Sequence, residues 1–317
     1  MAAELPTVDY SNMKRDELIT ICKETGIKGY SGKKKNVILS LLSESNEKKN
    51  HVIASVLELN KNTSPLRYPG GKTRAITILY EYIQTYYPQR KIVLSPFFGG
   101  GSFELFLSVN GYTVYGNDLF RPLYNFWTVK QTNCKTLTTK IKENIPISKE
   151  KFYQLRNTIM KEHDSLEMAV SYFIINRTSF SGATLSGGFS EQASKGRLTE
   201  SSLHRLLDCN VDAITFSNLD CNAFLDNYPE THDTVLYADP PYYINKYIYG
   251  KDGDMHENFN HIAFAETIRK RNDWIISYND CEYIRDLYKG CRIFNTHWSY
   301  GMNKNKKSSE IIILPPA

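Results

Sequence analysis

Hydrophobic positions recur at helical spacing near the N-terminus of this chain. Residues 13–26 and 29–42 each carry an apolar stripe on a polar and charged segment, which predicts two short helices around a turn. Gly26 is the expected stop of the first helix, and Ser31 is the expected cap of the second. The residues that follow are polar and only weakly helical, and they predict a linker.

Farther along, the pattern changes to short apolar runs that alternate with helix-like segments. The runs are rich in β-branched residues, as strands are, and lie at residues 91–97, 111–118, 234–242 and 273–280. This alternation is typical of a parallel sheet with helices on both faces.

Two regions depart from that alternation. Residues 292–301 and 308–315 flank a basic loop, and we expect them to pair as a terminal antiparallel hairpin. Residues 122–215 are polar and helical and interrupt the strand pattern. The sequence therefore predicts an α/β domain with a helical insertion.

Composition and charge limit the partners and the cellular compartment that we expect for this protein. The formal net charge of +5 permits a nucleic-acid partner without requiring one. The six cysteines form no CxxC pair and the histidines show no ligand spacing, so we expect no metal site and a reduced compartment. The N-terminus lacks the apolar core of a signal peptide, and no run reaches the roughly 20 apolar residues that span a bilayer. We expect a soluble, cytoplasmic protein without a membrane segment.

Three consecutive glycines follow the first predicted strand. Glycine allows a tight turn and lets a ligand lie against the backbone. Asp118 ends the next strand about 20 residues later, where an acid can accept both ribose hydroxyls of a nucleoside cofactor. The segment FGGGSF lacks the third glycine of a dinucleotide fingerprint, which favours a nucleoside without a pyrophosphate, such as S-adenosylmethionine. An ordinary strand-to-helix turn remains the alternative.

The tetrad Asp-Pro-Pro-Tyr at residues 239–242 follows another predicted strand. Two prolines fix the backbone and remove two N–H donors, which leaves the Asp239 carboxylate and the Pro240 carbonyl as acceptors. A planar amino group can donate to both acceptors while Tyr242 stacks on its ring. Such contacts draw the amino nitrogen toward tetrahedral geometry and aim its lone pair at an incoming methyl group. A Pro-Pro turn after a core strand is the alternative.

A third motif, LRYPGGKTRA, places a Gly-Gly turn before Lys72. Lys72 can meet the carboxylate of a cofactor, with Tyr68 packed nearby. The GxxxxGK[ST] spacing of a phosphate loop is absent, which argues against a nucleoside triphosphate site.

In the order RYPGGK, PFFGGGSFEL and DPPYY, the motifs resemble the Dam-type class of adenine-N6 DNA methyltransferases. INRTSFSGATLSGGFS, WIISYND and SSEIIIL extend the resemblance over residues 62–317. It implies a Rossmann-like S-adenosylmethionine-dependent methyltransferase fold, with residues 122–215 as a helical target-recognition insertion. The implied activity is transfer of a methyl group to N6 of an adenine that is flipped out of double-stranded DNA.

The resemblance also implies roles for individual residues. The catalytic residues that would hold the flipped adenine are Asp239, Pro240, Pro241 and Tyr242. The cofactor residues would be Tyr68, Gly70, Gly71, Lys72, Pro96, Phe97, Phe98, Gly99, Gly100, Gly101, Ser102, Asp118, Asp220 and Asp239. Asp220 falls where the family has an acid for the cofactor's adenine, but Cys221 stands where an aromatic often follows that acid. Because of this departure, the sequence does not show which residue would contact that side of the cofactor's adenine.

The N-terminal helices resemble a SAP module, a small DNA-binding unit, through their G…GYSGKKK turn. Residues 11–42 carry seven Lys/Arg against three Asp/Glu, a local net charge of +4. Lys33, Lys34 and Lys35 are therefore predicted DNA contacts, because basic side chains neutralise phosphates. A helical extension that packs on the catalytic domain or contacts another protein is the alternative.

The expected domains are a SAP-like module at residues 1–45, a linker at 46–63 and a methyltransferase domain at 64–317. Within the insertion, the predicted DNA contacts are Arg177, Lys195 and Arg197, for which solvated surface is the alternative.

Two other functions compete with this interpretation. An RNA or cytosine-N4 methyltransferase would share most of the motifs, but cytosine-N4 enzymes of this kind usually carry Ser where Asp239 stands. A DNA-binding protein with a decayed catalytic domain is the other, and the intact tetrad argues against it. A restriction endonuclease that recognises the same site is a conceivable partner.

Overall fold

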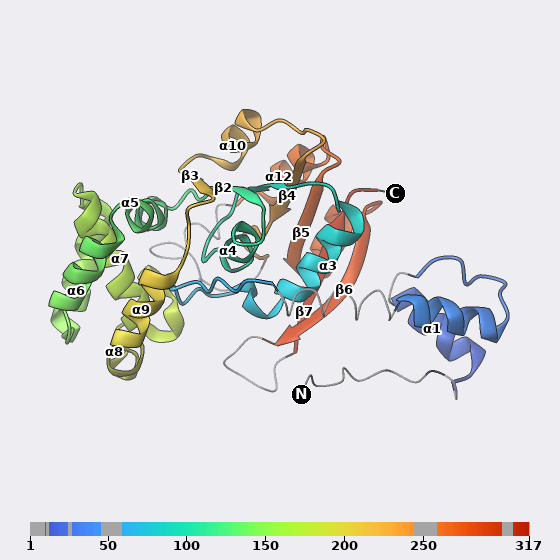
Figure 1. Ribbon diagram of the computed structural model, residues 1–317, viewed down its shortest axis with the longest axis horizontal. Helices are drawn as coiled ribbons and strands as arrows, with labels where there is room; N and C mark the ends of the chain where they lie inside the picture. Colours follow the sequence, from blue (N-terminus) through green and yellow to red (C-terminus); the bar gives the residue numbers. More distant parts are fainter. Residues whose placement is uncertain are drawn as a thin grey trace.

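A seven-stranded sheet forms the centre of the computed structural model (Figure 1). The structure describes residues 10, 13–24, 27–45, 59–243, 259–299 and 307–316. The strands are β1 (Ile92–Ser95), β2 (Thr113–Asn117), β3 (Ile214–Ser217), β4 (Thr234–Ala238), β5 (Trp274–Asn279), β6 (Arg292–Ser299) and β7 (Lys307–Leu314). Their order across the sheet is β3-β2-β1-β4-β5-β7-β6.

The pairing confirms the predicted sheet and hairpin. Strands β3, β2, β1, β4 and β5 are parallel to their neighbours, whereas β7 is antiparallel to both β5 and β6. Strand β3 was not predicted and falls within the last residues expected for the insertion and just after them. Only four residues long, with the mixed sequence ITFS, it carries little of the apolar pattern that marks the central strands.

Both faces of the sheet are buried, because successive side chains of a strand point to opposite faces. In β1, Val93 packs in one hydrophobic cluster and Leu94 in the other. In β5, Ile275 and Ile276 divide in the same way. This explains why the central strands are continuous apolar runs.

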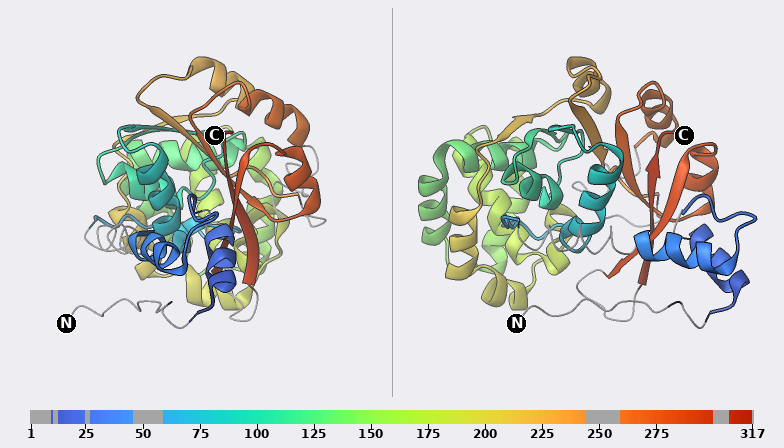
Figure 2. Two further views of the ribbon diagram at one scale, coloured as in Figure 1. Left: turned by 90° about the vertical axis from the view of Figure 1, so that its right-hand side faces the viewer. Right: turned by 45° about the vertical axis from the view of Figure 1, so that its right-hand side comes forward.

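Helices cover each face. On the Val93 side lie α3 (Ile76–Tyr86), α4 (Ser102–Ser108) and α5 (Arg121–Glu143). On the Leu94 side lie α10 (Cys221–Asn227), α12 (His261–Ile268) and α13 (Glu282–Leu287). Figure 2 shows the sheet between the blue-green helices α3 and α4 and the orange and red helices α12 and α13.

Helices α5 to α9 gather beyond the β3 edge of the sheet (Figure 1). Besides α5, they are α6 (Lys149–Thr158), α7 (Ser165–Thr178), α8 (Glu191–Arg197) and α9 (Glu200–Asp208), with short 3₁₀ turns η2 (Ile159–Lys161), η3 (Phe180–Gly182) and η4 (Thr184–Ser186). Helix α7 is buried on every side from Met168 to Thr178 and forms the centre of this group. A helix that is buried on all sides needs packing partners on all sides, and α7 packs against α5, α6 and α8.

Near the N-terminus, α1 (Arg15–Glu24) and a second helix at residues 35–45 share a small core. Its buried members are Leu18, Cys22, Ile38 and Leu42. The two predicted helices are thus confirmed, but Ser31 lies in a turn four residues before the second helix and does not cap it. Gly26 and most of the expected linker lie outside the described residues. The resemblance to a SAP module stays a prediction.

Within the described residues, no helix is both long and apolar enough to cross a membrane.

Candidate active site

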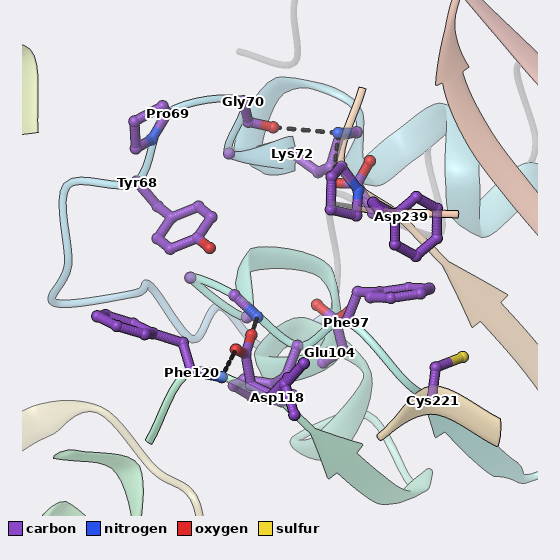
Figure 3. A pocket seen from close by; sticks show the side chains of 18 of the residues that line it. Tyr68, Pro69, Gly70, Lys72, Phe97, Glu104, Asp118, Phe120, Cys221 and Asp239 are labelled. Carbon is purple, nitrogen blue, oxygen red and sulfur yellow. Dashed lines mark hydrogen bonds and ion pairs between the residues drawn. The ribbon is translucent and has the colours of Figure 1, made fainter. Parts of the chain in front are cut away.

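A pocket of about 460 Å³ opens at the carboxyl ends of β1, β2 and β4, where open α/β sheets bind their ligands. The predicted site residues that line it are Tyr68, Gly70, Gly71, Lys72, Phe97, Phe98, Gly99, Gly100, Gly101, Ser102, Asp118, Asp220, Asp239 and Pro241. Pro96, Pro240 and Tyr242 are described and stand outside the lining. Figure 3 shows Lys72 and Asp239 on one side of the pocket, with Asp118 and Phe120 on the other.

The Gly-rich turn after β1 forms one wall of the pocket because side chains pack directly against it. Gly101 has φ +64°, and a Cβ there would lie 2.4 Å from the ring of Phe98. A Cβ at Gly100 would lie 2.7 Å from the Cβ of Tyr68. The triple glycine therefore serves both the backbone conformation and the close approach of Tyr68.

Asp118, directly after β2, stabilises this turn through hydrogen bonds. Its Oδ2 accepts a hydrogen bond from the Gly99 N–H at 2.9 Å, and its Oδ1 accepts one from the Phe120 N–H at 2.9 Å. Burial raises the pKa of the Asp118 carboxyl to about 6. Each carboxylate oxygen retains a second lone pair that a ribose hydroxyl can use.

Lys72 and Asp239 form the centre of a buried polar network. Lys72 Nζ lies 2.5 Å from Asp239 Oδ2, 2.8 Å from Tyr242 Oη and 3.1 Å from the Gly70 carbonyl. Tyr242 Oη in turn donates to Glu310 Oε2 at 2.7 Å. Three acceptors engage the three donors of Lys72, so a contact with a cofactor carboxylate requires the exchange of one of them.

The tetrad is held in place from β5. Ser277 Oγ donates to Asp239 Oδ1 at 2.9 Å. The amide of Asn279 pairs with both backbone groups of Tyr243, accepting from its N–H and donating to its carbonyl, each at 2.9 Å. Asn279 therefore fixes the backbone just after Tyr242 and positions the tetrad.

The far end of the pocket is largely apolar. The ring of Phe97 meets those of Phe259 and Phe264 edge to face, with centroids 5.4 and 5.3 Å apart. Asp220 is exposed there and accepts from the Asn222 N–H at the start of α10. Burial raises the pKa of the Cys221 thiol to about 12, so this side chain stays neutral beside the aromatic rings.

Several parts of the pocket were missed in the sequence, among them the aromatic end at Phe259 and Phe264. Glu104, in the first turn of α4, is 3 % exposed and lines the pocket. Glu104 is the one charged residue in the mostly apolar helix SFELFLS, so the sequence did contain a signal for it. Ala183, Thr184 and Leu185 reach the pocket from the expected target-recognition insertion, and no local pattern signals that approach.

Arg177 lies inside the insertion and not on its surface. It is 4 % exposed, and its guanidinium donates to the carbonyls of Arg197 at 2.8 Å and Pro65 at 3.3 Å. The side chain ties α7 to two distant segments, so the DNA contact expected for Arg177 is not retained.

We predict that Arg177→Ala destabilises the fold. The change strips two carbonyls of a hydrogen-bond donor, and each buried group left without a partner costs about 1–3 kcal/mol. Denaturant unfolding should show this loss, whereas the exposed neighbour in Arg197→Ala should change the free energy of unfolding little. Equal stability of wild type and Arg177→Ala, with weakened DNA binding, would restore the contact that the sequence suggested.

The other predicted DNA contacts are exposed. Lys195 forms an ion pair with Glu191 at 2.7 Å, one helical turn away. Arg197 and Arg205 are exposed. Burial lowers the pKa of the Arg177 guanidinium, and the positive charges of Arg205, Arg67 and Arg197 lower it further. Lys33, Lys34 and Lys35 are exposed at the start of the second N-terminal helix.

A known protein family matches most of the chain. The family model described as D12 class N6 adenine-specific DNA methyltransferase matches residues 68–302. No curated protein matches the chain.

Proposed function

The chain belongs to the D12 class of N6 adenine-specific DNA methyltransferases, and from this membership we propose that S-adenosylmethionine is its methyl donor and that the target adenine leaves the duplex before transfer. One observation carries the proposal: a single pocket joins the Gly-rich turn and Asp118 to the tetrad at Asp239. A nucleoside cofactor and an amino-bearing base can therefore meet within one cavity.

The lining of the pocket fits S-adenosylmethionine. Asp118 and the Gly-rich turn would hold the ribose, and the aromatic end with Phe97 and Cys221 would take the adenine. The cofactor would supply an electrophilic methyl group on sulfur. Asp220 is exposed and would contact the edge of the cofactor's adenine.

Asp239 would accept a hydrogen bond from the exocyclic amino group of the flipped adenine, and the Pro240 carbonyl would accept the second. These acceptors would aim the nitrogen lone pair at the methyl group, so positioning and fixed electrostatics would lower the barrier. Asp239 need not take a proton first, because the amine becomes acidic only once it is methylated. Lys72 donates to Asp239 Oδ2 in this structure, so the adenine would have to share or displace that contact.

The substrate class can be tested by transfer of tritiated methyl groups. Unmethylated genomic DNA should accept label from S-adenosylmethionine, whereas cellular RNA should not. Label on RNA alone would overturn the assignment of DNA as substrate. Label on neither would favour a protein that binds DNA without catalysis.

Phe180 fits a role in opening the duplex. Its side chain is 68 % exposed at the end of α7, beside the pocket-lining residues 183–185. In the loop that presents it, Gly182 packs against the backbone of Arg67, and Ser181 has φ +54°. A large exposed ring next to the pocket is suited to fill the space that a flipped base leaves.

We predict that Phe180→Ala lowers kcat/KM on duplex DNA by about 10-fold, the loss that corresponds to 1–2 kcal/mol of stacking. The defect should shrink when the target adenine sits in a mismatch, because less unstacking is then needed. Met160→Ala, at another exposed apolar side chain, is the matched control. A defect of the same size on paired and mismatched substrates would exclude this role.

The N-terminal lysines offer a further prediction. Changing Lys33, Lys34 and Lys35 to Ala should weaken DNA binding at low salt and leave the methylated site unchanged, because phosphate contacts are blind to sequence. The plot of log affinity against log salt should become shallower by about 0.9 per lost contact. Lys270→Ala with Lys289→Ala, two exposed lysines elsewhere, is the control. An unchanged slope would leave the module as a packing or protein-interaction element.

A further inference from the structure

We infer that the Glu104 carboxylate binds the α-ammonium group of the cofactor and accepts hydrogen bonds from it. Its carboxylate lines the pocket beside the Gly-rich turn and is 3 % exposed. It lies near the end of the motif PFFGGGSFEL, but the resemblance assigns a role only to residues 96–102 of that motif. The inference itself rests on that function, because it assumes that the bound cofactor carries an amino-acid end.

The charges around Glu104 favour a cation in the pocket. Glu104 lies close enough to Asp239 and Lys72 for both to influence its pKa. Lys72 is already bound to Asp239, so its positive charge compensates that acid. When it is ionised, Glu104 adds a second negative charge that Lys72 offsets only in part. An ammonium group that enters with the cofactor would balance it and donate hydrogen bonds to it.

The other acids of the pocket are engaged elsewhere. Both oxygens of Asp118 accept backbone N–H groups, and Asp239 accepts from Lys72 and Ser277. Asp220 is exposed at the start of α10. Glu104 Oε1 accepts from Ser95 Oγ at 2.8 Å, and among the described residues no side chain is seen to donate to Oε2. Glu104 is therefore the acid of this pocket with most capacity to accept a new donor.

The protonation state of Glu104 provides a second way to test the inference. Burial raises the pKa of its carboxyl to about 7. Hydrogen bonds from its own backbone N–H and from Ser95 oppose that rise, Asp239 adds to it, and Lys72 opposes it. The hydroxyl of Tyr237 also lies near and is itself neutral, because burial raises its pKa far above the usual value. Near pH 7 the Glu104 carboxyl is therefore partly protonated. An arriving ammonium group would lower the pKa and expel that proton.

The test uses calorimetry on the full chain without DNA. The ligands are S-adenosylhomocysteine, which has the ammonium but no sulfonium charge, and its analogue without the α-amino group. Wild type should bind S-adenosylhomocysteine about 10- to 100-fold more tightly than the analogue, as expected for one charge-assisted hydrogen bond. Glu104→Gln should lose this preference and keep its affinity for the analogue. Ser95→Ala, which leaves the carboxylate in place, should retain most of the preference.

Proton release separates the inference from a loss of structure. In buffers of different ionisation enthalpy near pH 7, wild type should release a fraction of a proton on binding S-adenosylhomocysteine, and Glu104→Gln should release less. Equal preference in wild type and Glu104→Gln would overturn the inference, as would an equal loss of affinity for both ligands. A defect seen with S-adenosylmethionine alone would assign Glu104 to the sulfonium instead. If wild type bound neither S-adenosylhomocysteine nor S-adenosylmethionine, the proposed function would fail, and the inference with it.

Discussion

Asp239→Ala is expected to reduce methyl transfer by at least 10²–10³-fold, the loss seen when one preorganised hydrogen-bonding group is removed from a transition-state site. The side chain is the acceptor in the tetrad that we assign to the adenine amino group. Single-turnover measurements at saturating DNA and S-adenosylmethionine would isolate this step. Cofactor affinity should change far less than the rate.

Asp239→Asn is the matched control for this substitution. It retains the shape and one acceptor oxygen but removes the charge that pairs with the buried Lys72. We expect a rate between those of wild type and Asp239→Ala. Near-normal turnover in Asp239→Ala would show that the tetrad does not hold the reacting amino group.

The second large effect is expected at Asp118. Asp118→Ala should weaken S-adenosylmethionine binding by about 10- to 100-fold, because hydrogen bonds to a charged group contribute about 1.5–3 kcal/mol. The substitution removes the proposed ribose contact and also the brace on the Gly99 and Phe120 N–H groups. Calorimetry without DNA measures the change directly.

The pH dependence of the same binding separates Asp118 from other causes. Burial raises the pKa of its carboxyl to about 6, so the group is ionised above that pH and protonated below it. A protonated carboxyl loses acceptor strength, so cofactor affinity should fall as the pH drops through 6. Asp118→Asn should lack the decline near pH 6 and keep the one near pH 7 that we expect from Glu104. Unchanged affinity in Asp118→Ala would contradict the assigned ribose contact.

The local features of the site could be predicted from the sequence. The Gly-rich turn and the tetrad each follow a strand with a continuous apolar run, Asp118 follows the more mixed strand β2, and parallel strands bring their carboxyl ends to one edge. Strand β4 ends at Ala238, directly before the tetrad, where two prolines remove the donors that a ladder needs. Sequence therefore located the tetrad although it extended the strand too far.

Contacts between distant segments could not be predicted in this way. The local sequence around Arg177 does not distinguish it from an arginine in an exposed loop. Only the packing of α7 shows that it is buried. The three partners of Lys72 come from its own turn and from the tetrad, 167 to 170 residues away. Residues 183–185 enter the pocket from the insertion, because the insertion packs against Arg67, next to Tyr68. Such contacts depend on tertiary geometry, which no local period records.

The central claim is that this pocket transfers a methyl group to N6 of adenine in DNA. Its most direct test is to incubate the protein with S-adenosylmethionine that carries an isotopically labelled methyl group and unmethylated duplex DNA. The DNA is then digested to nucleosides, and the labelled product is identified by mass spectrometry for wild type and for Asp239→Ala. We predict labelled N6-methyl-2′-deoxyadenosine from wild type and a loss of at least 100-fold in Asp239→Ala. Labelled N4-methyl-2′-deoxycytidine, or equal product from both proteins, would contradict the account.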